Sequence, residues 1–157
     1  MKTLKKYYQH LKIIKINKKK YTYKDYPISE KYPETVKAKS KKPLSDLTIE
    51  NLINEKLTME DFRISEESLI AQAEIAESIG RYSLAKNFRR GAEMVRLPQK
   101  EIFEIYEKLR PGRAKSKGEL ISIARKLKEK YHALILASFV EEAADIYEKR
   151  DLFNKRY

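Results

Sequence analysis

The sequence predicts an all-α protein: a small helical domain of four to five main helices that includes an αα-hairpin and follows an extended, proline-containing arm. Apolar residues recur at three- and four-residue steps through much of the chain, which is the spacing of one helix face. No stretch after residue 25 shows the apolar–polar alternation of a half-buried strand. We therefore divide the chain into a basic extension over residues 1–24, an arm over 25–47 and a helical domain over 48–157.

The extension contains no acidic residue. Leu4, Tyr7, Tyr8 and Leu11 fit one face of a short amphipathic helix, but the isoleucines that follow break its period. A membrane-surface helix, a docking peptide and a nucleic-acid-binding arm would each suit such a segment. A poorly ordered basic tail is the simpler interpretation, because short isolated helices are marginal in water.

The net charge of +12 belongs mainly to the front of the chain. Residues 1–42 hold 14 lysines and 3 acidic residues, whereas the remaining 115 residues hold 21 basic and 20 acidic ones. A nucleic-acid-binding domain more often spreads its Lys and Arg over a folded face. We therefore do not expect nucleic acid as a partner, although a basic helical nucleic-acid-binding protein or an adaptor stays the alternative function.

Neither a membrane segment nor a secretory signal is visible in the sequence. No run reaches the roughly eighteen apolar residues of a transmembrane helix, and the basic N-terminus lacks the apolar region and cleavage site of a signal peptide. The chain has no cysteine, which excludes disulfides and thiolate chemistry. We expect a cytoplasmic protein without a membrane partner.

The arm over residues 25–47 contains Pro27, Pro33 and Pro43 and few apolar anchors. Each proline disfavours helix in the residue before it, so the arm is expected to be extended and to lie on this domain or on a partner. Short helices follow. Thr48 is a predicted cap, and Thr58 with its acidic partner three residues later resembles a capping box.

The helical hairpin begins after Ser65, a predicted N-cap with two glutamates in the first helical turn. Gly80 separates the two helices, since a helix that ends in the left-handed region favours glycine there. Gly91 lies inside the second helix, where it costs about 1 kcal/mol relative to alanine. It therefore predicts close approach of another backbone. The predicted inner faces are Leu69, Ala73, Ala76 and Ile79, and Leu84, Phe88, Ala92 and Val95.

Three further helices complete the domain. Pro98 suits the first turn of one helix, Pro111 and Gly112 end it, and Ser116 caps the next. The last helix spans about residues 134–149. The predicted inner faces are Ile102, Ile105, Tyr106 and Leu109, then Leu120, Ile123, Ala124, Leu127 and Tyr131, and finally Ile135, Phe139, Ala143 and Ile146.

The residues that most catalytic sites need are scarce. His10 and His132 are the only histidines, and no glycine lies in a phosphate-binding loop pattern. We expect no catalytic, cofactor-binding or metal-binding residue on this chain. Arginines beside tightly packed glycine and proline positions suit an interface with carboxylates, and surface solubility is the alternative. These arginines are Arg81, Arg90, Arg110 and Arg113.

The order and spacing of several short motifs resemble the small (gamma) subunit of adenosylcobalamin-dependent diol (propanediol) and glycerol dehydratases. The resemblance covers about residues 25–150. Among the motifs are Asp25-Tyr26-Pro27, Lys42-Pro43-Leu44, Phe62-Arg63-Ile64-Ser65, Gly80-Arg81, Leu109-Arg110-Pro111 and Glu142-Ala143-Ala144.

The resemblance implies a helical, non-catalytic subunit of a radical hydro-lyase. Such an enzyme is a dimer of heterotrimers that converts 1,2-propanediol to propionaldehyde, or glycerol to 3-hydroxypropionaldehyde. Its large (alpha) and medium (beta) subunits bind adenosylcobalamin, and the small subunit serves assembly and stability. The arm, with Tyr26, Pro27 and Pro43, would then lie along the large subunit. Some relatives act inside bacterial microcompartments, but the lysine density of residues 1–24 is not typical of the extensions that direct enzymes there.

Overall fold

A computed structural model describes residues 19–153 of the chain and shows an all-α fold. Within that range no β-strand occurs, and the only β-type pairing is one antiparallel bridge between Lys37 and Pro43. The five main helices are α4 (Glu66–Ser78), α5 (Tyr82–Met94), α6 (Gln99–Lys108), α7 (Lys117–Tyr131) and α8 (Leu134–Lys149). The predicted fold class and helix count are therefore confirmed. The helix face predicted around Leu4 lies outside the described residues.

Shorter helical turns precede the hairpin. They are η1 (Tyr23–Asp25), α2 (Ile28–Lys31), η2 (Pro33–Thr35), η3 (Leu44–Asp46), α3 (Ile49–Ile53) and η4 (Met59–Phe62). The N-caps predicted at Thr48, Ser65 and Ser116 each accept the expected backbone N–H, and the capping box of Thr58 and Asp61 is present. Local sequence therefore determines where most of these elements begin.

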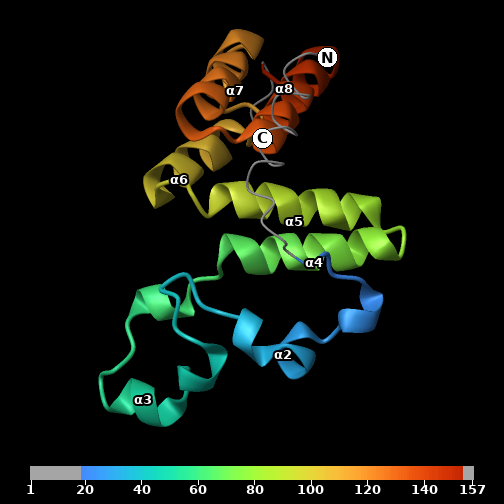
Figure 1. The fold of residues 1–157 in the computed structure, drawn as a ribbon. Coiled ribbons are helices and arrows are strands. Elements are labelled where there is room, and N and C mark those ends of the chain that lie inside the picture. The colour runs from blue at the N-terminus through green and yellow to red at the C-terminus, as the bar shows by residue number, and fades with distance from the viewer. Residues whose placement is uncertain (1–18, 154–157) are drawn as a thin grey trace.

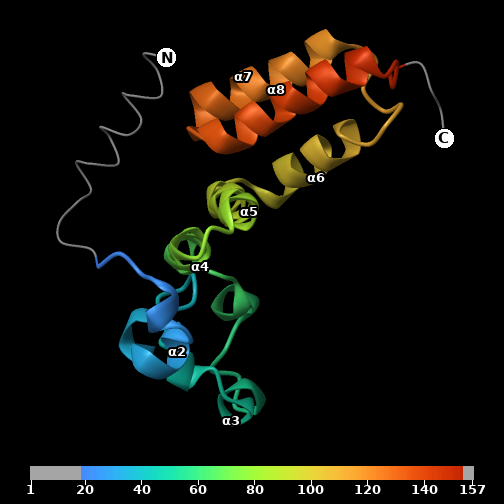
Figure 2. The same ribbon diagram turned by 90° about the vertical axis from the view of Figure 1, so that its right-hand side faces the viewer.

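The helices stack in three layers (Figures 1 and 2). An upper layer holds α6, α7 and α8, a middle layer is the α4–α5 hairpin, and a lower layer holds the short helical turns. α7 packs along α8, α5 faces α8, and α4 faces η1. Three apolar clusters hold these layers: one within the upper layer, one between the hairpin helices, and one between the arm and α4. The molecule is therefore an elongated stack without one central core.

Small residues let the hairpin helices approach closely. Ala73 and Ala76 of α4 pack against Ala85 of α5, and all three are buried. Gly80 adopts a φ of +75°, with its N–H bonded to the carbonyl of Glu77 and the next N–H bonded to that of Ala76. This is the pair of bonds that closes a helix end with glycine at C′. The hairpin is therefore closed by its own backbone, as the sequence predicted.

Gly91 has a different neighbour from the one predicted. A Cβ added there would lie 3.6 Å from the side chain of Leu69 and meet no foreign backbone. The expectation of a close backbone approach is wrong, because a leucine side chain on α4 fills the space over the glycine.

Four predicted inner faces are wrong in part. Ile79 at the end of α4 and Tyr106 of α6 are exposed. Leu84 of α5, like Phe139 and Ile146 of α8, is more than one-third exposed. Almost every position in the first half of α8 is apolar, so the sequence allows several faces to turn inward. The face of α8 that carries Ala137 and Ala144 turns inward, because small side chains allow close contact with α7. The buried face of α8 is Leu136, Ala137, Val140 and Ala144.

A buried carboxylate joins the middle layer to the upper one. Glu93 of α5 accepts hydrogen bonds from the backbone N–H groups of Ile135 (3.1 Å) and Leu136 (2.7 Å) in the first turn of α8. The residue at the N-cap of α8 is Ala133, which has no side-chain acceptor. Glu93 therefore caps α8 from another helix and faces the positive end of its dipole.

The arm folds back onto this domain. Tyr21 and Ile28 pack against Ala71 and Ile75 of α4, and the backbone N–H of Tyr21 donates to the carboxylate of Glu74 at 2.9 Å. Helical turns interrupt the arm, so it is not continuously extended as predicted. Its apolar contacts also begin four residues before the predicted start of the arm.

Candidate subunit interface

Two buried carboxylates in the lower layer hold the turns of the arm together. Asp61 accepts hydrogen bonds from the backbone N–H of Thr58 (2.7 Å) and from the ammonium of Lys42 (2.9 Å). Hydrogen bonds from Ser40, Thr58 and Lys42 hold the pKa of Asp61 well below its usual range. The carboxylate therefore stays ionised and is fully engaged by the fold.

Asp25 plays the same part at the start of the arm. It accepts hydrogen bonds from the ammonium of Lys19 (2.7 Å), the backbone N–H of Thr22 (2.8 Å) and the hydroxyl of Tyr32 (2.8 Å). The hydrogen bond from Lys19 has the largest effect and, with those from Thr22 and Tyr32, holds the pKa of Asp25 well below the ordinary aspartate value. Its role is to hold the first turns of the arm to one another.

The interface residues predicted in the arm lie in the lower layer. The Tyr26 side chain is exposed, and Pro27 is half-buried beside it. Both line a hollow of about 640 Å3 between the arm and α4. Pro43 is also half-buried and forms the β-bridge with Lys37. These three residues therefore lie at the surface of one layer.

The four predicted arginines are dispersed. Arg81 is exposed at the start of α5, and the guanidinium of Arg90 lies over the Phe139 ring at 4.2 Å. Arg110, just beyond the end of α6, pairs with Glu107 of that helix at 3.1 Å, and Arg113 is exposed in the loop between α6 and α7. The structure therefore spreads the seven predicted residues over all three layers and gathers no single cluster from them.

Six large apolar side chains on and next to α3 and η4 are exposed, whereas the sequence indicated only short helices there. The side chains of Ile49, Ile53 and Met59 are 77%, 75% and 81% exposed. Leu52, Phe62 and Ile64 are about half exposed. The sequence feature that could have indicated this exposure is a series of large apolar residues in segments too short to form a core, with acidic residues between them.

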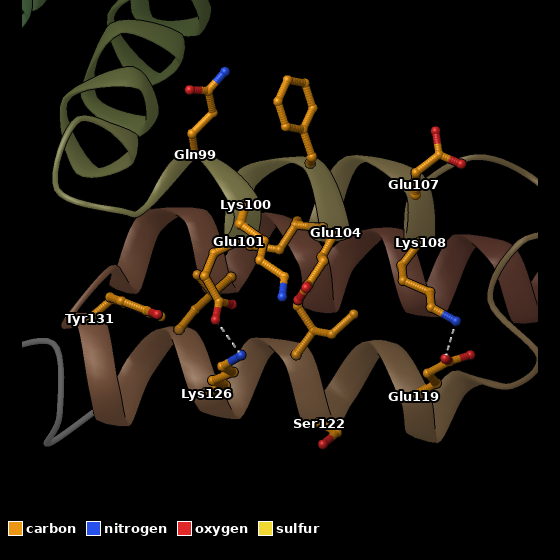
Figure 3. A pocket seen from close by; sticks show the side chains of 14 residues that line it. Gln99, Lys100, Glu101, Glu104, Glu107, Lys108, Glu119, Ser122, Lys126 and Tyr131 are labelled. Carbon is orange, nitrogen blue, oxygen red and sulfur yellow. Dashed lines mark hydrogen bonds and ion pairs between the residues drawn. The ribbon is translucent and has the colours of Figure 1, made fainter.

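A groove between α6 and α7 has a volume of about 840 Å3 (Figure 3). Ion pairs cross it, from Lys126 to Glu101 at 2.7 Å and from Lys108 to Glu119. The hydrogen bond from Lys126 lowers the pKa of Glu101, and that from Lys108 lowers the pKa of Glu119. These charges are paired with each other and hold α6 beside α7. The exposed aromatic rings of Phe103 and Tyr106 lie on α6.

Over residues 19–153, no group of three or more His, Cys, Asp or Glu side chains is arranged to hold a metal ion. None of the helices in this range has the length and apolar character needed to span a membrane.

The chain matches the family model described as "Dehydratase small subunit" over residues 21–154. It is 48% identical over 126 residues to the propanediol dehydratase small subunit of Citrobacter freundii, covering 80% of this chain and 73% of that protein. It is also 48% identical over 126 residues to the protein of the same name from Salmonella typhimurium, covering 80% of this chain and 72% of that protein.

Proposed function

Because this chain belongs to the dehydratase small-subunit family, we propose that it is the small, non-catalytic subunit of an adenosylcobalamin-dependent propanediol dehydratase. The supporting observation is the 48% identity to two propanediol dehydratase small subunits over 80% of the chain. The assembled enzyme would convert 1,2-propanediol to propionaldehyde, or glycerol to 3-hydroxypropionaldehyde. Large and medium subunits are the proposed partners, and the cytoplasm is the proposed location.

We assign the cofactor to the partner subunits and derive no chemical step on this chain. When bound, adenosylcobalamin supplies the radical chemistry. The groove between α6 and α7 is crossed by two ion pairs, from Lys126 to Glu101 and from Lys108 to Glu119. The contribution of this chain is then to bind the folded complex and shift its assembly equilibrium by mass action. Such a role requires surface that a partner covers, and the exposed apolar side chains of α3 support it.

Reconstitution tests this function. We would co-express the chain with large and medium dehydratase subunits, add adenosylcobalamin, and measure aldehyde formed from 1,2-propanediol and from glycerol. A preparation that lacks the small subunit is the control. We expect a stable complex of all three subunits and activity that depends on this chain. If the chain stays outside the complex and activity is unchanged, the proposed function is wrong.

A further inference from the structure

We propose that residues 19–25 form a strap that one positive charge holds on α4. The charge is the ammonium of Lys19, which lies in a cage of one carboxylate and two tyrosine rings. Removing this charge should release the strap from α4 while the five main helices stay folded. The inference concerns this chain alone and goes beyond the proposed function, which gives these residues no role.

The cage surrounds the ammonium with the two kinds of group that attract a cation. The Nζ atom of Lys19 lies 2.7 Å from a carboxylate oxygen of Asp25 and 3.7 Å from the centre of the Tyr32 ring. The centre of the Tyr21 ring lies 5.8 Å from the same atom. Cation–π attraction extends to about 6 Å from a ring centre, so both rings contribute to the cage.

The fold arranges the walls of the cage. The rings of Tyr21 and Tyr32 meet edge to face, with their centres 6.0 Å apart. The Tyr32 hydroxyl donates to one oxygen of Asp25 at 2.8 Å, and the N–H and hydroxyl of Thr22 donate to the other oxygen. The Asp25 side chain is only 11% exposed, so water screens its charge weakly. Its hydrogen bond with Lys19 raises the pKa of that lysine, which keeps the ammonium charged.

Backbone hydrogen bonds and an apolar contact join the strap to α4. The N–H of Tyr21 donates to the carboxylate of Glu74 at 2.9 Å, and the N–H of Tyr23 donates to the hydroxyl of Ser78 at 2.8 Å. These two acceptors are about one helical turn apart, so the strap runs along α4. The buried Tyr21 side chain packs on Ile75 of α4 and also forms a wall of the cage. Loss of the ammonium therefore weakens the contact between the strap and α4.

This part of the fold can open by itself. The buried residues of its apolar cluster belong neither to the cluster inside the hairpin nor to the one around α7 and α8. Regions with few buried apolar contacts open at a lower free energy than the whole domain unfolds. Lys19 also follows directly on residues 1–18, so the strap determines where the basic extension joins the folded domain.

The absence of cysteine from the chain allows a direct test of the charge. K19C in the full-length protein is alkylated in two ways. Aminoethylation restores a lysine-like ammonium, and carboxamidomethylation adds a neutral group of similar size. Amide hydrogen exchange is then measured in peptides that cover residues 19–25 and in peptides of α7. Each rate is divided by that of the same peptide in the unfolded chain, so that intrinsic exchange rates cancel.

We expect residues 19–25 to exchange at least about fivefold faster in the neutral form of K19C than in the aminoethylated form. Exchange in α7 should differ less than about twofold between these forms, because the strap opens locally. The exposed neighbour Lys20 provides the control. The two alkylated forms of K20C should exchange alike over residues 19–25.

A double-mutant cycle tests the ring of the cage. Y32F and Y32L both lack the hydroxyl that binds Asp25, but only Y32F keeps the ring. K19M keeps the length of the lysine side chain and removes its charge. We expect Y32L to exchange faster than Y32F over residues 19–25 when Lys19 is present, and this difference to shrink in the K19M background.

Three results would overturn the inference. Equal exchange over residues 19–25 in the two alkylated forms of K19C would show that the charge does not hold the strap. Additive effects in the double-mutant cycle would show that the ammonium and the ring do not interact. Faster exchange in α7 to the same extent would mean that Lys19 supports the whole fold and not a separate strap. The reconstitution experiment measures assembly and activity instead, so the proposed function stands or fails independently of these results.

Discussion

Single residues in this protein act mainly through backbone geometry and buried hydrogen bonds. Gly80 has a positive φ at the hairpin turn, whereas Gly91 is an ordinary helical residue. Asp25 and Asp61 are held ionised by the groups around them. These positions are where one substitution or a change of pH should have the clearest effect on stability.

The two glycines form a matched pair for mutation. Gly80→Ala should lower the free energy of unfolding by about 1–2 kcal/mol, because an L-residue at a φ of +75° is strained even though no atom lies near its Cβ. Gly91→Ala should raise the free energy of unfolding by about 0.5–1 kcal/mol. Alanine has the higher helix propensity, and the new Cβ makes an ordinary contact with Leu69. Urea denaturation of both variants measures this difference. Equal effects of the two substitutions would contradict the assigned geometry.

Acid should destabilise the protein through its paired carboxylates. The folded-state pKa of Asp25 and of Asp61 lies below the ordinary value of 3.8. As the pH falls through the ordinary aspartate pKa, the unfolded state takes up protons while both carboxylates in the folded state stay ionised. The stabilisation that these carboxylates give at higher pH is therefore lost progressively. We expect the melting temperature to fall steadily from about pH 5 towards pH 2. Asp61→Asn should melt lower at pH 7 and lose less on acidification, and a parallel pH profile for the two proteins would refute this.

At the scale of elements, α8 shows how far the sequence was informative. The position and length of α8 were predicted well from its apolar spacing, since the predicted span of about residues 134–149 matches Leu134–Lys149. Its buried face was not predicted, since nearly every early position is apolar and the choice depends on packing against α7. The cap from Glu93 was also missed, because no local pattern announces an acceptor that lies some forty residues away.

The corrected face of α8 can be tested directly. Leu136→Ala should destabilise the protein by about 2–5 kcal/mol, because its side chain is buried and the cavity cannot collapse fully. Ile146→Ala, on the face first predicted to be inward, should have a much smaller effect. Thermal denaturation of the two variants decides between the faces, and a larger loss for Ile146→Ala would restore the original prediction.

The remote cap gives a second test at this scale. Glu93→Ala removes the acceptor for two N–H groups of α8 and should lower stability by about 1–2 kcal/mol. Glu142→Ala, an exposed carboxylate on the same helix, is the control and should change stability by less than about 0.5 kcal/mol. Similar losses in the two variants would mean that Glu93 does not cap α8.

At the scale of the whole molecule, the sequence predicted the fold class and the family more completely than the candidate site. Helical periodicity and caps are local, so Ser65 and Gly80 could be interpreted without a structure. A docking surface depends on which side chains stay exposed after packing, and that is a property of the whole fold. The sequence therefore did not indicate that Ile49 and Ile53 stay exposed to solvent.

The three separate apolar clusters also bear on cooperativity. The lower layer is held on α4 by a small cluster of four buried residues, Tyr21, Ile28, Ala71 and Ile75, whereas the cluster around α7 and α8 is much larger. Amide hydrogen exchange should therefore be slowest in α7 and α8 and fastest in α3, with sub-global openings that release the lower layer first. Binding that covers the lower layer would slow its exchange more than that of α7 and α8. We therefore expect the free chain to unfold in separate steps, and the chain in the complex to unfold cooperatively.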